Sequence, residues 1–176
     1  MTDSLSNTIA DFPTLQRHVG TWEGRFLFID PDTGEPVDSH ACKLEIGHQG
    51  NLYTQRNTYT WEDGRVEVHD FPGVFVNGEL VIDSHDLTGF AVETNEGGYT
   101  DKQGGADTIL FYATYKPESH RAGVDVWDLI RITNETQRYR TWQIKGGDKV
   151  VKLCHVDEHR TSSENAFNPE MHPPQK

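Results

Sequence analysis

The 176-residue sequence has no apolar run long enough to cross a bilayer, which takes about 18 to 20 residues. Its first ten residues are polar and lack the basic, then apolar, pattern of a secretion signal. Positive charge is scarce, because 16 Lys and Arg stand against 28 Asp and Glu, for a formal net charge of -12. Binding to nucleic acid or to an anionic membrane depends on Lys and Arg, so we expect neither partner. The default expectation is a cytoplasmic protein.

Cysteine is scarce as well. Cys42 and Cys154 are too few for a disulfide framework and lack the spacing of metal ligands, so we expect two buried free thiols. A single disulfide stays open as an alternative if the strands that carry them meet. The sequence also lacks a Walker loop, a dinucleotide fingerprint, a nucleophile elbow and a Cys-rich zinc pattern. Enzyme classes that are built on these motifs are therefore not expected.

Segments rich in β-branched and aromatic residues fill most of the chain, and short turn signals separate them. The clearest turns are Asp63-Gly64 and Asn77-Gly78, because these residue types adopt the positive φ angles of tight hairpins. Only residues 11–18 have a convincing helical pattern. The predicted strands cover residues 21–30, 38–47, 52–61, 65–71, 79–83, 86–93, 107–116, 124–133, 138–145 and 148–158.

Many strands joined by short hairpins, with no long helix between them, predict an all-β fold. A meander of this size usually closes on itself to remove its free edges, so we expect an antiparallel up-and-down β-barrel of roughly 8 to 10 strands with a short N-terminal helix. A two-sheet sandwich is the alternative. The barrel domain is expected over residues 11–160, between a flexible N-terminus (1–10) and a polar C-terminal tail (161–176) that is loose or disordered. The glycine-rich segment 94–106 is expected to be a mobile loop that could cover the barrel mouth.

One face of the strand at 52–61 combines aromatic rings with amides. Side chains alternate along a strand, so Tyr53, Gln55, Asn57, Tyr59 and Trp61 share this face. The rings favour an inward orientation, yet a buried amide without partners costs about 1–3 kcal/mol. This face therefore suits a wet or ligand-filled cavity better than a dry core. The alternative is that the two amides bond to neighbouring groups in an ordinary core.

A second polar feature lies near the C-terminus. Asp128 interrupts the apolar face of strand 124–133, and Arg140 lies with Arg138 and Trp142 on the inward-looking face of the next strand. Because the two strands are consecutive, Asp128 and Arg140 could meet across a hairpin. One interpretation is a structural ion pair that fixes the register of the strands. The other is that Arg140 anchors a carboxylate or enolate oxygen, with Asp128 as its orienting partner or as a general base.

The nine histidines form no compact metal motif, since zinc needs three or four converging ligands, and we expect neither a metal nor another cofactor. His69 and His85 are candidates for proton transfer. Trp22 is expected at the floor of the barrel, and Arg160, near the end of the last strand, could stack on its ring.

The stretch Gly20-Thr21-Trp22-Glu23-Gly24 resembles the Gly-X-Trp start of lipocalins and other calycins, where the tryptophan closes the barrel base. Further landmarks resemble a poorly characterised lipocalin-like family that is described as a domain of unknown function. They are the alternating run from Tyr53 to Trp61 with Asp63-Gly64, Arg140-Thr141-Trp142 and Val156-Asp157-Glu158-His159-Arg160. The resemblance implies a fold shared by ligand carriers, haem and bilin proteins and cofactor-free decarboxylases. A haem barrel would require a proximal histidine, and His155 is the nearest candidate.

Two functions follow from these residues. The favoured one is a cofactor-independent lyase, isomerase or cyclase for a small aromatic or terpenoid-like substrate, because a carrier of apolar ligands would have a more uniformly apolar lumen. In that mechanism Arg140 holds an anionic oxygen, Tyr59 or Tyr53 donates a proton, and Asp128 or His69 accepts one. The alternative is a non-catalytic carrier or sensor of a small hydrophobic ligand. The residues expected to bind the ligand are Tyr53, Gln55, Asn57, Trp61, Tyr112 and Trp142, and a homodimer is left open.

Overall fold

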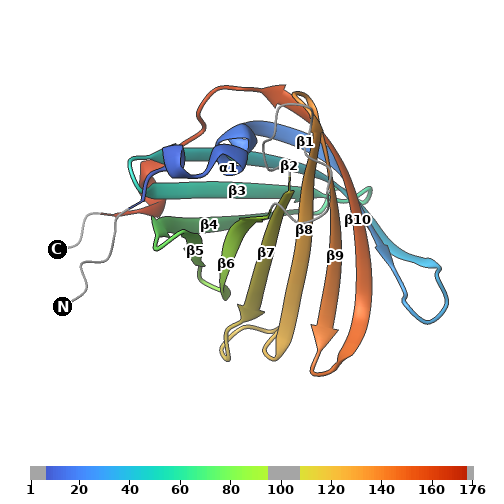
Figure 1. Cartoon of the computed structure of the whole chain (residues 1–176). Coiled ribbons are helices and arrows are strands. Elements are labelled where there is room, and N and C mark those ends of the chain that lie inside the picture. The colour runs from blue at the N-terminus through green and yellow to red at the C-terminus, as the bar shows by residue number, and fades with distance from the viewer. Residues whose placement is uncertain (1–6, 95–107, 174–176) are drawn as a thin grey trace.

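The computed structural model of the protein describes residues 7–94 and 108–173, in which ten strands form a closed antiparallel barrel (Figure 1). The strands are β1 (Gly20–Ile29), β2 (Pro36–Gln49), β3 (Leu52–Thr60), β4 (Val66–Val76), β5 (Glu79–Asp83), β6 (Leu87–Thr94), β7 (Thr108–Tyr115), β8 (Val124–Asn134), β9 (Gln137–Gly146) and β10 (Lys149–Ser162). The helices are the 3-10 helix η1 (Ile9–Asp11), α1 (Pro13–His18) and the 3-10 helix η2 (Pro169–Met171). The loop predicted at 94–106 lies outside the described residues, except for Thr94 at the end of β6.

Each strand pairs with the next one along the chain, and β1 also pairs with β10 to close the barrel. The closing seam aligns Trp22 with Arg160 and Ile29 with Leu153. The predicted up-and-down barrel is therefore confirmed, and the alternative sandwich is excluded. Asn77 and Gly78 form the predicted turn between β4 and β5, with φ angles of 52° and 83°.

The largest difference from the predicted strands is at the end of β4, which was expected at residue 71 and continues to Val76. Pro72 and Gly73 are residue types that usually end a strand. Here Pro72 pairs only with Thr54 of β3, because the pairing of β4 with β5 begins at Gly73. A strand position with a neighbour on one side tolerates proline, so β4 passes through it.

The N-terminal helices close one end of the barrel (Figure 1). Phe12 and Leu15 are buried, and the ring of Phe12 lies 4.9 Å from that of Phe75 at the end of β4. The Trp22 indole nitrogen donates a hydrogen bond of 2.9 Å to the carbonyl oxygen of His18, which ties the last turn of α1 to β1. This end of the barrel, with α1 across it, is called the base below. Within residues 7–94 and 108–173, no helix has the length and apolar character to span a membrane.

The described part of the C-terminal tail packs against the outside of β2 and β3. The Asn165 side chain accepts a hydrogen bond from the His48 amide and donates one to its carbonyl, both at 2.9 Å. The amide of Asn168 donates to the Thr54 hydroxyl at 3.0 Å. A Cβ atom on Gly47 would lie 2.0 Å from the backbone of the tail, so glycine is required for this contact. Up to residue 173 the tail is thus an ordered strap.

Both cysteines are buried free thiols, as predicted, and no disulfide joins them. Burial raises the pKa of the Cys154 thiol to about 12 and also raises that of Cys42. Both groups are therefore protonated and unreactive near neutral pH.

Candidate functional site

The barrel encloses a cavity of about 370 Å³, within the range that small organic ligands occupy. It begins at the base, where Leu15 and His18 of α1 line it. It extends to the opposite end, called the mouth, where partly exposed side chains such as Trp61 and His69 line it.

The cavity has two unlike walls. One wall is formed by apolar side chains of the middle strands: Leu80, Ile82, Leu87, Ala91, Ile109, Phe111, Val126 and Ile130. The other is formed by aromatic and polar side chains from the first and last strands: Phe26, Phe28, His40, Gln55, Asn57, Tyr59, Trp61, Arg140 and Trp142. A molecule inside the barrel would therefore meet hydrocarbon on one side and hydrogen-bonding groups on the other.

The ring of Phe26 lies at the centre of the second wall. The Trp142 ring packs edge-on against it with the centroids 4.9 Å apart, and Tyr59 does the same at 5.3 Å. His40 stacks on Phe26 at 5.3 Å and contacts the Trp61 ring at 4.3 Å. These five rings, those of Phe26, Trp142, Tyr59, His40 and Trp61, are called the aromatic wall below.

Polar side chains of β3 form a chain of hydrogen bonds along the cavity. The Tyr53 hydroxyl donates to Gln55 Oε1 at 2.7 Å, Gln55 Nε2 donates to Asn57 Oδ1 at 2.8 Å, and Asn57 Nδ2 donates to the Tyr59 hydroxyl at 2.8 Å. The amides are thus paired with neighbouring groups, yet all four side chains also line the cavity. Burial raises the pKa of both tyrosines, so they stay neutral phenols.

Asp128 and Arg140 are in contact, as their strand positions predicted. Arg140 Nε donates to Asp128 Oδ2 at 3.0 Å, and Nη2 contacts the same oxygen. Ile130 is the residue directly opposite Arg140, so the pair is diagonal across the hairpin. Asp128 Oδ1 is buried and has no hydrogen-bond partner among the described residues. Burial raises the pKa of Asp128 despite the opposing charge of Arg140.

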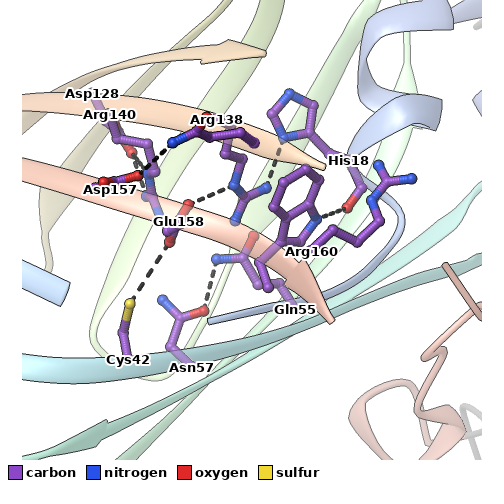
Figure 2. Close-up of polar contacts among 12 residues, drawn as sticks. His18, Cys42, Gln55, Asn57, Asp128, Arg138, Arg140, Asp157, Glu158 and Arg160 are labelled. Carbon is purple, nitrogen blue, oxygen red and sulfur yellow. Dashed lines mark hydrogen bonds and ion pairs between the residues drawn. The ribbon is translucent and has the colours of Figure 1, made fainter. Parts of the chain in front are cut away.

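Glu158 connects this pair to the base of the barrel (Figure 2). Arg138 Nε donates to Glu158 Oε2 at 2.5 Å, and Arg140 Nη1 donates to Oε1 at 3.4 Å. Arg138 Nη1 lies 2.7 Å from His18 Nδ1, so this ring nitrogen accepts the hydrogen bond. Burial and then the nearby Arg138 hold the pKa of His18 well below its usual range. Burial pushes the pKa of Glu158 upward, but the two arginines more than offset this and lower it.

Glu158 and His18 were not among the predicted site residues. Glu158 shares strand parity with the buried Cys154 and Val156, and that alternation is the signal that could have identified it. His18 is 120 residues from Arg138 in sequence, and no local pattern predicts their contact.

Tyr112 does not line the cavity, which corrects its prediction as a ligand-binding residue. The cavity-facing residues of β7 are Ile109, Phe111 and Tyr115, so alternation places Tyr112 on the outer face. There its ring packs 4.6 Å from that of Trp127. The other predicted ligand-binding residues all line the cavity.

The candidate histidines are dispersed. His69 lines the mouth, with Nε2 3.4 Å from Glu67 Oε2 and its ring 5.6 Å from that of Tyr59. His85 is exposed in the turn between β5 and β6, and His155 is exposed on the outer face of β10. Among the residues that the structure describes, no three His, Cys, Asp or Glu converge as metal ligands do.

No protein-family model matches the chain, and no curated protein matches its sequence. Solved structures do match its fold. A protein of unknown function from the DUF3598 family of Nostoc punctiforme has a TM-score of 0.58 and 15% identity over 89% of this chain and 50% of that one. The S-type phycobiliprotein lyase of Guillardia theta has a TM-score of 0.60 and 10% identity over 90% of this chain and 94% of that one.

The chain thus spans about half the length of the DUF3598 protein and nearly all of the phycobiliprotein lyase. At these identities the likeness concerns the fold alone. It confirms the lipocalin-like barrel that the Gly20-Thr21-Trp22 stretch predicted.

Proposed function

We propose that the protein binds a small, uncharged and largely apolar molecule inside the barrel. The observation that carries this proposal is the cavity of about 370 Å³ with one hydrocarbon wall and one aromatic and polar wall. Such a lining binds a ligand mainly by burying its apolar surface and orients it through a few polar contacts. The acidic net charge disfavours nucleic acid or an anionic membrane as the partner. The proposed location remains the cytoplasm, as expected from the sequence.

The buried charges support an uncharged ligand. Arg138 and Arg140 are matched by Glu158 and Asp128, so the network is neutral with His18 uncharged. An anionic ligand would add a buried charge without a counter-ion, and that costs several kcal/mol. Arg140 is therefore better suited to support the polar wall than to anchor a carboxylate, which was one of the two roles expected from its sequence position.

A cavity-filling substitution tests the binding proposal. Ala91 is buried on the hydrocarbon wall, and Ala41 is exposed on the outer face of β2. We expect Ala91→Phe to weaken binding of the neutral fluorescent probe N-phenyl-1-naphthylamine at least tenfold, which is about 1.4 kcal/mol. Ala41→Phe adds the same ring outside the barrel and should leave the affinity unchanged. Equal binding by a folded Ala91→Phe variant, with folding checked by circular dichroism, would contradict binding in the cavity.

One observation favours a catalytic version, an isomerase or lyase without a cofactor. Asp128 Oδ1 is a buried carboxylate oxygen without a partner, on a residue that lines the cavity. It could accept a proton from a ligand carbon while the electron pair of the C–H bond moves into the ligand, and it could return the proton at another carbon. Tyr59 or His69 would hold the developing charge.

The catalytic version can be tested without a known substrate, by measuring whether the protein exchanges hydrogen atoms of a bound ligand for deuterium. Molecules extracted from the purified protein are identified by mass spectrometry and returned to the protein in deuterated water. An enzyme of this kind should incorporate deuterium into the ligand, and Asp128→Asn should abolish the incorporation while Asp125→Asn, on the outer face of the same strand, keeps it. If the ligand binds to the unaltered protein and gains no deuterium, the catalytic version is contradicted and the protein is a carrier or sensor.

A further inference from the structure

The polar wall of the cavity has hydrogen atoms to donate and few atoms to accept them. Asn57 donates to the Tyr59 hydroxyl oxygen, so the proton of that hydroxyl is not used in the chain along β3. Gln55 Nε2 carries two hydrogens and makes one hydrogen bond, to Asn57. The Trp142 indole nitrogen is buried and has no partner among the described residues. On this wall and beside it, two buried atoms without a partner among the described residues could accept a hydrogen bond: Asp128 Oδ1, and His40 Nδ1 if the ring proton is on Nε2.

Two of these donors belong to the aromatic wall. Tyr59 and Trp142 pack edge-on against the same Phe26 ring, with centroid distances of 5.3 and 4.9 Å. Both line the cavity, and the side chain of Phe26 between them is fully buried. A buried donor without a partner costs about 1–3 kcal/mol. A ligand that brings an acceptor atom to this wall would remove that cost.

Charge narrows the class of acceptor. Arg140, whose guanidinium carbon lies 5.2 Å from the centre of the Trp142 ring, already bonds to two carboxylates. A third carboxylate, from the ligand, would be an uncompensated negative charge in the barrel. A carbonyl oxygen accepts hydrogen bonds without bringing a charge.

We propose that the ligand is an uncharged carbonyl compound, such as an aryl ketone or a quinone, whose oxygen accepts a hydrogen bond from Tyr59 on the aromatic wall. This inference rests on the binding function proposed above and names the chemical class of the ligand. The flat apolar body of such a compound would lie against the hydrocarbon wall. The indole N–H of Trp142 is the second donor on the same wall.

A matched pair of ligands tests this assignment. 2-Acetylnaphthalene and 2-isopropylnaphthalene have similar shapes, and the ketone alone carries an acceptor. The measured quantity is the ratio of their dissociation constants, obtained by displacement of N-phenyl-1-naphthylamine. We expect Tyr59→Phe to shift this ratio against the ketone about fivefold, because one hydrogen bond contributes about 1 kcal/mol. Tyr112→Phe removes a hydroxyl from the outer face and should leave the ratio unchanged.

Trp142→Phe provides a second variant and should shift the ratio in the same direction. An unchanged ratio in both variants would overturn the carbonyl assignment, as would tighter binding of 2-naphthoate or 2-naphthol than of the ketone. Those results would leave the binding proposal intact, because the probes still enter the cavity. Failure of the unaltered protein to bind N-phenyl-1-naphthylamine or any of the four naphthalene compounds would overturn the binding proposal together with this one.

Discussion

Two tryptophans at opposite ends of the barrel have the same kinds of partner and differ in exposure. At the base, the guanidinium carbons of Arg138 and Arg160 lie 4.4 and 4.6 Å from the centre of the fully buried Trp22 ring. At the mouth, the guanidinium carbon of Arg65 lies 3.7 Å from the centre of the half-buried Trp61 ring. The Trp22 N–H donates to a backbone carbonyl, and that of Trp61 donates to the Asp38 carboxylate at 3.2 Å.

The comparison shows that burial determines how much the same kinds of contact contribute to the free energy of unfolding. Water screens the charges at the mouth, so an ion pair there contributes about 0–1 kcal/mol. At the base the charges have lost their hydration, and each one depends on its partner. The base is therefore expected to be fixed by its ion pairs, while the mouth can rearrange at little cost.

The largest expected effect comes from removing one charge at the base. Glu158→Gln leaves Arg138 and Arg140 with one carboxylate between them, so the free energy of unfolding should fall by about 3–5 kcal/mol. Urea denaturation followed by tryptophan fluorescence measures this change. Asp157→Asn, next in sequence and exposed, should change stability by less than about 0.5 kcal/mol. Similar values for the two variants would contradict the contrast between base and mouth.

The next largest loss of stability is expected when the two tryptophans are replaced by phenylalanine. Trp22→Phe removes the indole donor to His18 and reduces the ring area under two arginines, so we expect a loss of about 2 kcal/mol. Trp61→Phe makes the matching change at the mouth, where water can replace the lost contact with Asp38, and should cost less than half as much. An equal loss in the two variants would show that burial does not govern these contacts.

The contribution of His18 to stability can be separated from that of other groups by its dependence on pH. Its pKa is lowered in the folded state, so below the unfolded pKa of about 6.5 the unfolded chain binds a proton that the folded chain does not. This contribution is fully present above that pKa and is lost as the pH falls. His18→Asn keeps an acceptor for Arg138 and cannot titrate. Between about pH 7.5 and about pH 5.5 the unaltered protein should lose about 1.4 kcal/mol more than this variant, measured by urea denaturation. If the free energy of unfolding falls equally with pH in the unaltered protein and in His18→Asn, groups other than His18 cause the acid sensitivity.

The smallest effect is expected at an exposed ion pair. Arg56 bonds to both carboxylate oxygens of Asp70 at 2.7 and 2.8 Å, and both side chains are about two-fifths exposed. Asp70→Asn should cost less than about 1 kcal/mol, and the cost should shrink further in high salt. Denaturation at low and high salt measures it. A loss as large as that of Glu158→Gln would show that this exposed pair contributes as much to stability as the buried ion pairs at the base.

The strands and turns could be predicted because their signals are local. Alternation and turn residues such as Asn77-Gly78 depend on neighbours in sequence, and the contact of Asp128 with Arg140 depends on two consecutive strands. The contact of His18 with Arg138 joins a helix to a strand 120 residues later, so no local pattern encodes it. Tyr112 shows that parity within a strand does not by itself tell which face is inward, because both faces of β7 carry large rings.

The seam between β1 and β10 has a consequence for how the chain folds. Its partners, such as Gly24 and Glu158, are more than 120 positions apart, so the barrel cannot close before the last strand has been synthesised. Until then Arg138 and Arg140 have no Glu158 to neutralise them, and their hydration opposes burial. Arrival of β10 both completes the sheet and supplies the missing counter-charge, which couples closure of the barrel to formation of the buried ion pairs of Glu158.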